Sequence, residues 1–254
     1  MVRAKRLIDQ AARLGASVWK TQVYEVAKVF PTHEILVNGR NWYEEVRQTQ
    51  LTKEQVFELA DYCEHAGIEF MASAFDTERL GWLEEVGVKR HKIASRTISD
   101  KDYVKAVLST GKSVIVSLGM WPGPGLPFLQ STTKIDFLYC VSKYPTELSD
   151  LHFDRVDFEL TYSGFSDHTI GIEASMMAIV KGARIIEKHF TLSRAAKGSD
   201  NAFSLEPEPM RRMVNDLRGV SVALGDGVKR AYPSEAPAML KMGKSLVAAR
   251  NLPA

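Results

Sequence analysis

Short apolar runs alternate with helical segments along most of this chain, and this alternation is the feature that most restricts its fold. Seven runs have the composition of strands: 16–22, 68–74, 91–96, 113–119, 135–142, 162–168 and 183–190. Most are nearly all apolar, as expected of parallel strands that are covered on both faces. From the run at 68–74 onward, each run starts 21 to 27 residues after the previous one. The pattern predicts a parallel sheet with right-handed crossovers.

Capping signals mark the helices between these runs. Thr52 and Gln55 have the spacing of a capping box at the start of segment 52–67. Ser99 is the predicted N-cap of the helix that ends at Gly111. The N-terminal segment 1–14 is basic and amphipathic, like a transit peptide, but its apolar period favours a packed helix that leads into the first strand.

The close, even spacing of the strands favours an α/β protein of the (β/α)8 TIM-barrel type. A doubly wound open sheet is the competing fold, but it usually carries a Gly-rich turn after its first strand, and this chain has none. Because seven strands are recognised and the chain begins inside a helix, we expect the barrel to be incomplete. Segment 121–130 is too rich in proline for a helix, and segment 23–51 is a long excursion at the end where barrels carry their sites.

The composition excludes several classes of protein. A net charge of +2 is too small to indicate binding to nucleic acid or to a membrane surface. No apolar run approaches the length of a membrane span. The two cysteines, Cys63 and Cys140, do not make a disulfide framework, so we expect a reducing, cytoplasmic location.

Every predicted strand ends in polar residues, and barrel enzymes build their sites at these C-terminal ends. Burying a lysine there is costly unless it meets an anion, so Lys20 and Lys92 indicate a phosphate or carboxylate ligand. Lys92 and Ser95 have opposite parity, so they share one site only if the strand ends or bulges near Ala94. The complete set is Lys20, Gln22, Ser73, Asp76, Lys92, Ser95, Ser117, Ser142, Tyr144, Ser166, His168, Glu187 and His189.

Two of the six histidines, His168 and His189, occupy equivalent positions at the ends of consecutive strands. Neutral imidazoles from neighbouring strands can bind one divalent ion, with an aspartate or water completing the shell. The alternative is that each is a hydrogen-bonded strand-end residue. Asp167 points to the other face and is a poorer ligand, whereas Asp200, in the following loop, could reach the mouth of the barrel.

At these residues the chain resembles the sialic acid synthase family, enzymes that join phosphoenolpyruvate to an N-acetylated sugar to make nonulosonic acids. The resemblance runs along nearly the whole chain and is most specific in the combination of "GFSDHTIGIEA" with "IEKHFTL". Further matching stretches are "GASVWKTQ", "FMASAFD", "KIASR", "YCVSKYPTEL" and "GSDNAFSLEP".

The resemblance implies a role for each matching residue. His168 and His189 would be ligands of a divalent metal, Mn2+ or Mg2+, and would act in catalysis together with Lys92. The residues implied to hold phosphoenolpyruvate are Lys20, Ser73, Lys92, Ser95, Ser142 and Ser166, and those near the sugar are Gln22, Tyr144 and Asp200. The family is dimeric, so a homodimer is expected here as well.

Departures from the family pattern keep other hypotheses open. The synthase barrel is expected over 1–230, and 231–254 resembles the lead-in to the family's antifreeze-like domain. The family's first strand, with its glutamate, has no counterpart before Met1, and Thr97 stands where a second glutamate is common. We therefore expect a second chain to cover the open side of the barrel and turnover to be low. A non-catalytic binding or scaffold protein is the main alternative, and a different metal-assisted barrel enzyme, such as an aldolase, is the third.

Overall fold

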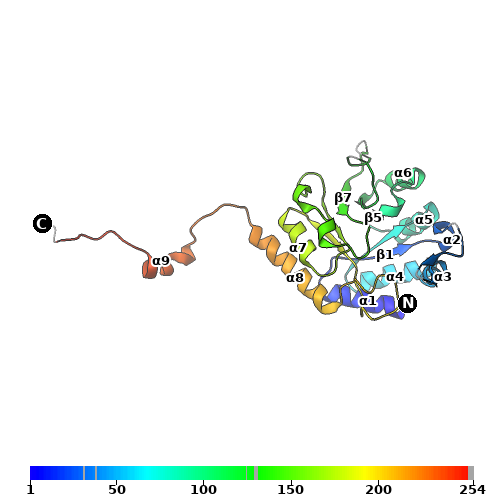
Figure 1. Ribbon diagram of the computed structural model, residues 1–254, viewed down its shortest axis with the longest axis horizontal. Coiled ribbons are helices and arrows are strands. Elements are labelled where there is room, and N and C mark those ends of the chain that lie inside the picture. Colours follow the sequence, from blue (N-terminus) through cyan, green and yellow to red (C-terminus); the bar gives the residue numbers. More distant parts are fainter. Residues whose placement is uncertain (31, 38, 124, 129–130, 251–254) are drawn as a thin grey trace.

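Seven parallel strands follow one another in chain order in the computed structural model, which describes residues 1–30, 32–37, 39–123, 125–128 and 131–250 (Figure 1). Strand β1 (Val18–Val23) pairs with β4 (Glu69–Ala74). A five-stranded sheet then runs in the order β5 (Arg90–Ile93), β6 (Ser113–Ser117), β7 (Ile135–Cys140), β8 (Gly164–Asp167) and β9 (Ile185–Lys188). All seven predicted strands are present, and the predicted class, an incomplete parallel α/β barrel, is confirmed.

Side chains join the two groups of strands where the described backbones form no ladder. Between β4 and β5, the Arg90 guanidinium donates two hydrogen bonds of 2.7 Å to the carboxylate of Glu69. At the other edges, Lys20 of β1 and Glu187 of β9 form an ion pair of 3.0 Å. This salt bridge therefore joins the first and last strands of the barrel.

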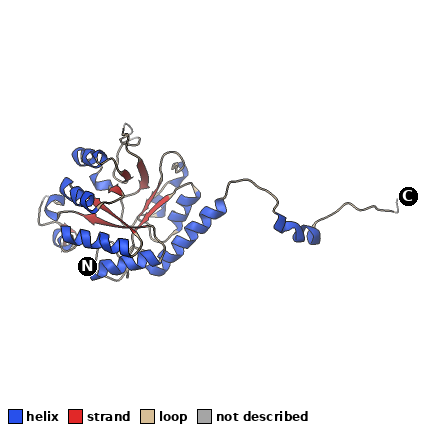
Figure 2. Ribbon diagram, turned by 180° about the vertical axis from the view of Figure 1, so that it is seen from behind, coloured by secondary structure: helices blue, strands red, loops and turns tan. Residues whose placement is uncertain are grey.

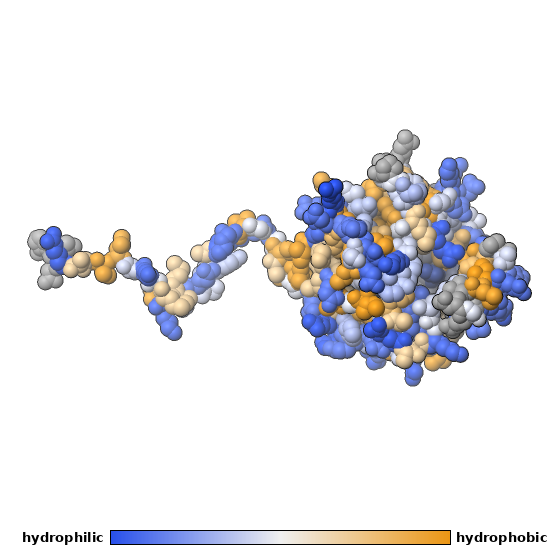
Figure 3. Space-filling view, in the orientation of Figure 1, coloured by the Kyte–Doolittle hydropathy of each residue, from blue (hydrophilic) through white to orange (hydrophobic). Residues whose placement is uncertain are grey.

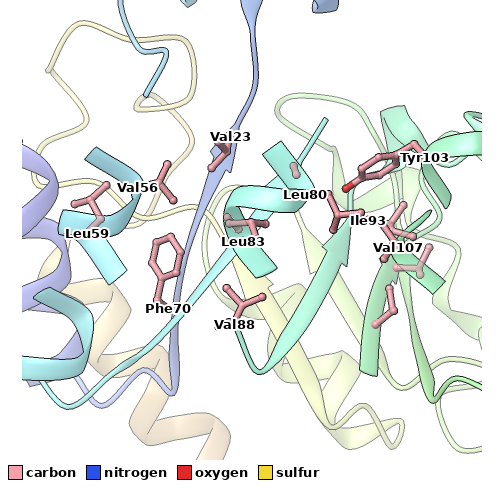
Figure 4. Packing of buried hydrophobic residues seen from close by; sticks show 14 of the residues in the cluster. Val23, Val56, Leu59, Phe70, Leu80, Leu83, Val88, Ile93, Tyr103 and Val107 are labelled. Atoms are coloured by element: carbon pink, nitrogen blue, oxygen red, sulfur yellow. The ribbon is translucent and has the colours of Figure 1, made fainter. Parts of the chain in front are cut away.

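The helices cover the outside of the strands. They are α1 (Val2–Arg13), α4 (Lys53–His65), α5 (Thr77–Val86), α6 (Lys101–Ser109), α7 (Glu173–Val180) and α8 (Pro207–Leu224). The main core lies between α4, α5, α6 and the strands beneath them, where Leu59, Leu83 and Val107 are fully or nearly fully buried (Figure 4). The predicted capping box of Thr52 and Gln55 is present at the start of α4.

The first and last helices of the barrel lie side by side (Figure 1). The Arg218 side chain of α8 donates a hydrogen bond of 2.7 Å to the carbonyl of Gly15, which follows α1. Beyond α8 the described chain extends away from the barrel and carries a 3-10 turn followed by a short helix, α9 (Ala236–Met242) (Figures 1 and 2). Figure 3 shows mostly hydrophilic side chains on one face of the barrel, with apolar groups scattered among them.

Several local predictions need correction. The N-cap of α6 is Asp100, whose carboxylate accepts from the Tyr103 N–H at 2.9 Å, and not Ser99. Five predicted strands also end earlier than expected, and in four of them the chain leaves the ladder before a candidate site residue: Ser95, Ser142, His168 and His189. These polar residues therefore lie in the turns just above the strands.

The two irregular segments differ in structure. Segment 23–51 forms α2 (Val26–Val29), a hairpin of β2 (Leu36–Val37) and β3 (Arg40–Asn41), and α3 (Trp42–Arg47). Its two ends are joined by a 2.8 Å hydrogen bond from the Val26 N–H to the Gln50 side chain. As predicted, the described part of 121–130 contains no helix; residues 124, 129 and 130 lie outside the described residues.

The remaining short elements are the 3-10 helices η1 (Ser95–Thr97), η2 (Leu148–Asp150), η3 (Phe153–Arg155) and η4 (Pro233–Glu235). No helix in the described ranges is both long and apolar enough to cross a membrane. Cys63 and Cys140 are free, buried thiols, in line with the prediction that they form no disulfide framework.

Candidate active site

The lumen of the barrel is layered because side chains two residues apart on a strand point the same way. Its floor is apolar, formed by Met71, Ile115 and Leu138 with Val18 and Ile185 packed against them. Two residues further along the same strands come Lys20, Ser73, Ser117, Cys140 and Glu187, joined by Lys92 of β5 and Ser166 of β8. On each of the five strands that form the floor, the lumen-facing side chain thus changes from apolar to a more polar one two residues further along.

Glu187 is the centre of this polar layer. Its carboxylate lies 3.0 Å from the Lys20 Nζ and 3.5 Å from the Lys92 Nζ. It also accepts hydrogen bonds from Ser166 Oγ at 2.7 Å and from Ser117 Oγ at 3.4 Å. Burial alone would raise the pKa of Glu187, but the charges of Lys20 and Lys92 outweigh it and hold the pKa well below 4.5. The glutamate is therefore ionised near neutral pH.

Lys92 is almost completely buried and depends on this network. Its ammonium donates to Ser117 Oγ at 2.7 Å and to the Ile93 carbonyl at 3.2 Å. Burial lowers the pKa of Lys92, and the nearby Glu187 carboxylate opposes that shift. One carboxylate thus neutralises two ammonium groups only in part, so this layer would stabilise a further negative charge.

Ser95 reaches the same layer although its parity on the strand is opposite to that of Lys92. Strand β5 ends at Ile93, and η1 turns the chain so that Ser95 Oγ donates to the Ser117 carbonyl at 3.2 Å. The condition stated from the sequence, that the strand must end near Ala94, is met. Ser73 Oγ, in contrast, is buried and has no hydrogen-bond partner in the described part of the chain.

The two histidines lie together above the polar layer, with ring centroids 5.4 Å apart. His168 Nδ1 donates to the Val141 carbonyl at 2.8 Å, which leaves the lone pair of Nε2 free when the ring is neutral. Burial lowers the pKa of His189 to about 4, so that ring is neutral near pH 7. The His189 ring is therefore in the protonation state that metal binding requires. For His168, burial lowers the pKa, but contacts with Cys140 and the Val141 carbonyl outweigh burial and raise the pKa above 6.5, so this ring must give up its proton to bind a metal.

Tyr144 forms a wall beside the histidines. Its ring centroid lies 4.3 Å from that of His168 and 6.3 Å from that of His189. Phe203 completes the wall, 5.8 Å from Tyr144 and 5.0 Å from His189. The histidine pair therefore has an apolar aromatic boundary on one side.

The outer candidates lie at the rim or away from the lumen. Gln22 is exposed two residues beyond Lys20, and Asp200 Oδ2 lies 3.6 Å from His189 Nδ1. Asp76 instead caps α5 by accepting from the Arg79 N–H at 2.9 Å. Asp167 pairs with Lys188 at 2.9 Å, away from the histidines, as its parity predicted.

The donor set around the histidines fits a weakly held divalent ion. Among the described residues, no three His, Cys, Asp or Glu side chains gather as a metal site. Two imidazoles are nevertheless available, His189 in its neutral form and His168 once it loses its proton, and the remaining coordination positions would belong to water or substrate oxygens. The residues present therefore suit a metal that binds together with its substrate.

Glu187 is the main functional candidate that sequence reasoning did not single out. Its position at the end of a strand was visible, but its role depends on contacts with Lys20 from the opposite edge and Lys92 from four strands away in the sheet. A buried lysine pair without a partner of opposite charge is the signal that could have identified it.

The fold and the lumen place the chain in the class of parallel (β/α) barrel enzymes. The NeuB family matches residues 7–229, and the chain belongs to this family. The expected family, the sialic acid synthase family, and the expected kind of enzyme, a condensing synthase, are thereby confirmed.

Named relatives are similar over almost the whole chain. The N,N'-diacetyllegionaminic acid synthase of Campylobacter jejuni is 31% identical over 98% of this chain and 80% of its own length. The human N-acetylneuraminate-9-phosphate synthase is 30% identical over 98% of this chain and 74% of its own length. An uncharacterized protein of Methanocaldococcus jannaschii is 33% identical over 98% of this chain and 75% of its own length.

Solved structures agree with the family and the fold. The N-acetylneuraminic acid synthetase of Leptospira borgpetersenii superimposes with a TM-score of 0.81 at 28% identity, over 94% of this chain and 85% of that one. A truncated 3-deoxy-D-arabino-heptulosonate 7-phosphate synthase of Thermotoga maritima reaches 0.67 at 17% identity, over 88% and 83% of the two chains, which shows likeness of fold alone.

Proposed function

We propose that this protein is a nonulosonic acid synthase that condenses phosphoenolpyruvate with an N-acetylated hexosamine and releases phosphate. The observation that carries the proposal is the polar layer of the lumen, where Lys20 and Lys92 share the single carboxylate of Glu187. One buried and one partly buried cation with one counter-ion favour a ligand that brings negative charge, and phosphoenolpyruvate carries a phosphate and a carboxylate. The names of the relatives support the same reaction.

The layer offers phosphoenolpyruvate both charge and hydrogen bonds. Lys20 and Lys92 would neutralise its anionic groups, and the unpartnered hydroxyl of Ser73 would donate to one of their oxygens. Ser95, Ser142 and Ser166 border the same space and supply further hydroxyl donors. The apolar floor lies directly beneath the layer, so the phosphate and carboxylate of phosphoenolpyruvate would stay at the level of the lysines.

The acceptor sugar would occupy the level of the histidines, directly above phosphoenolpyruvate. His168 and His189 would hold Mn2+ or Mg2+, which when bound would polarise the aldehyde oxygen of the open-chain sugar. Tyr144 would pack against the sugar, and Gln22 and Asp200 would contact it from the rim. This order puts the aldehyde carbon next to the enol carbon of phosphoenolpyruvate.

The reaction balances with these groups. The C3 carbon of phosphoenolpyruvate forms a bond to the aldehyde carbon, and the aldehyde oxygen takes up a proton to become a hydroxyl. Water then adds to C2 and loses one proton, which balances the proton taken up by the aldehyde oxygen. The C2–O bond to phosphate breaks as the remaining hydroxyl proton passes to the departing phosphate, which leaves the 2-oxo group. Lys20 and Lys92 stabilise the departing phosphate by charge, while the ionised Glu187 carboxylate opposes the lowering of the Lys92 pKa by burial.

A non-catalytic binding protein remains the second candidate, because of one observation. Thr97 is buried and its hydroxyl bonds the Ala94 carbonyl at 3.1 Å, so it brings no carboxylate to the mouth of the barrel. A protein of this kind would bind phosphoenolpyruvate in the lumen without releasing phosphate.

Turnover and binding measured together distinguish the two candidates. The purified chain is incubated with phosphoenolpyruvate, Mn2+ and N-acetylated hexosamines, and phosphate and product are followed by 31P NMR and mass spectrometry. Lys92→Met should lower kcat/KM by about 10- to 100-fold, since a hydrogen bond to a charged group contributes about 1.5–3 kcal/mol. Lys134→Met, at a lysine whose side chain is 77% exposed, is the matched control.

Each outcome has a separate meaning. Phosphoenolpyruvate binding without phosphate release, for every acceptor tried, would favour the binding protein over the synthase. Absence of both binding and turnover would refute both candidates, and unchanged kcat/KM in Lys92→Met would remove Lys92 from the site.

A further inference from the structure

A buried ion pair on the outer face of the sheet, below the two histidines, is not used by the proposed reaction. It joins Asp167, the last residue of β8, to Lys188, the last residue of β9, with the carboxylate and the ammonium 2.9 Å apart. The two side chains are 0% and 2% exposed. Asp167 and Lys188 are also opposite each other in the ladder, so this outer ion pair closes the last paired position of the two strands.

The outer ion pair is adjacent in sequence to both histidines. Asp167 directly precedes His168, and Lys188 directly precedes His189. The Asp167 carboxylate accepts a hydrogen bond from α7 outside the barrel, whereas His168 Nδ1 lies 3.9 Å from Cys140 Sγ in the lumen. Each strand end therefore carries a charged group on its outer side and an imidazole on its inner side.

Hydrogen bonds extend the outer ion pair to the residue that follows His168. The Thr169 N–H and hydroxyl donate to one oxygen of Asp167 at 2.8 and 2.7 Å, and the Thr169 carbonyl accepts from Lys188 Nζ at 2.6 Å. The Ser175 hydroxyl of α7 donates to the other oxygen of Asp167 at 2.6 Å. The backbone is therefore held by one network on both sides of His168.

The free energy of folding alone gives little reason for charges at this place. Taking two charges out of water costs about as much as their attraction returns, so well-packed apolar side chains would stabilise the fold as well. Apolar packing has no direction, whereas an ion pair with hydrogen bonds fixes the relative position of the groups that it joins. A metal site has this requirement, because its ligand distances are kept within about 0.2 Å.

We infer that the outer ion pair of Asp167 and Lys188 positions His168 and His189 for a shared metal ion. The inference rests on the proposed function, in which these histidines hold Mn2+ or Mg2+, and adds two positioning residues to it. Both side chains point away from the lumen, so the pair acts through the backbone by holding the ends of β8 and β9 at a fixed separation.

The test removes both charges together, so that neither is left unpaired. In Asp167→Asn/Lys188→Met, the amide oxygen can still accept from Thr169, and methionine approximates the shape of the lysine stem. Binding of Mn2+ alone is followed by the electron paramagnetic resonance signal of the free ion. We expect the Mn2+ dissociation constant to rise about tenfold, as for other contacts that hold metal ligands in place, and the affinity for phosphoenolpyruvate in calorimetry to stay unchanged.

The matched control is Glu69→Gln/Arg90→Met. This ion pair also joins neighbouring strands, but it lies at the first residues of β4 and β5, at the opposite end of the barrel. Its loss should leave the Mn2+ dissociation constant unchanged. Thr169→Val keeps both charges of the outer ion pair and removes one hydrogen bond, so it should raise the constant by a smaller factor, about threefold.

Stability and metal affinity should separate. Lys188→Met leaves Asp167 unpaired and should have a lower thermal unfolding midpoint than Asp167→Asn/Lys188→Met, although both should bind Mn2+ equally weakly. A dissociation constant that follows the unfolding midpoint would assign the pair to stability alone and overturn the inference. Wild-type affinity in Asp167→Asn/Lys188→Met and in Thr169→Val would do the same, as would Mn2+ binding that His168→Ala leaves unchanged.

Failure of the inference differs from failure of the proposed function. A wild type that binds Mn2+ more tightly than Asp167→Asn/Lys188→Met, yet never releases phosphate, would refute the synthase and support the role of the outer ion pair. A wild type that releases phosphate, with Mn2+ affinity equal to that of the double variant, would support the synthase and refute the role of the outer ion pair.

Discussion

Replacing Glu187 with glutamine tests whether this carboxylate stabilises the folded protein as the counter-ion of the two lysines in the lumen. Glutamine keeps the shape of the side chain and can still accept the 2.7 Å hydrogen bond from Ser166 Oγ, but it removes the charge. Lys92, whose side chain is 3% exposed, and Lys20, whose side chain is 23% exposed, would then face each other without a counter-ion. We therefore expect Glu187→Gln to be less stable than the wild type.

The magnitude follows from the two distances. Unit charges about 3 Å apart interact by about 5 kcal/mol at an effective dielectric constant of about 20. The cost of desolvating the charges offsets part of this, and breaking one buried pair typically costs about 3–5 kcal/mol. Water screens the more exposed Lys20, and Lys92 can lose its proton because burial already lowers its pKa. We expect a loss of about 3 kcal/mol in the free energy of unfolding at pH 7.

The effect should depend on pH in one direction. The pKa of Glu187 lies well below 4.5 in the folded protein, so its charge stabilises the fold fully above the unfolded-state pKa, about 4.3. That stabilisation is lost as the pH falls through the folded-state pKa. The stability difference between wild type and Glu187→Gln should therefore shrink with acidification below about pH 4.

Urea unfolding of four proteins measures this network: wild type, Glu187→Gln, Lys92→Met and the double variant Lys92→Met/Glu187→Gln. The double variant should be more stable than the sum of the two single losses predicts, because it leaves neither member of the pair alone. Additive losses, or a Glu187→Gln variant within about 1 kcal/mol of wild type, would show that the carboxylate is not the counter-ion.

Two further predictions concern other buried polar groups. Ser73→Ala should change the free energy of unfolding by less than about 0.5 kcal/mol, because its hydroxyl has no partner among the described residues, yet it should weaken phosphoenolpyruvate binding about tenfold in calorimetry. Ser175→Ala is its control: losing the 2.6 Å bond to Asp167 should cost about 1–3 kcal/mol without affecting binding. Lys188→Met should cost about 3–5 kcal/mol in urea unfolding, because the side chain of its partner Asp167 is 0% exposed; a loss below about 1 kcal/mol would contradict this.

The elements of the fold were predictable from the sequence because they depend on local patterns. Apolar runs of strand length predicted all seven barrel strands, and the Thr52–Gln55 spacing predicted a capping box that is present. The N-cap of α6 was placed one residue early, at Ser99, because Ser99 and Asp100 carry equally good capping side chains. Only the backbone geometry decides which of the two accepts from the Tyr103 N–H.

The residues of the candidate site could be predicted from the sequence, because parallel strands bring their C-terminal ends to one face of the barrel. That rule alone brought the lysines, the serines and the two histidines into one list, and the structure places them in adjacent layers. Their roles as ligands of phosphoenolpyruvate, sugar and metal are still predictions.

Pairing across the lumen was decided by the tertiary structure alone. Glu187 and Lys20 are far apart in the sequence. They form an ion pair because the curvature of the sheet brings β9 close to β1. Lys92 of β5 reaches the same carboxylate from four strands away in the sheet. The sequence determines which side chains stand at the strand ends, but curvature and loop packing determine which charges find a partner and which are left for a ligand.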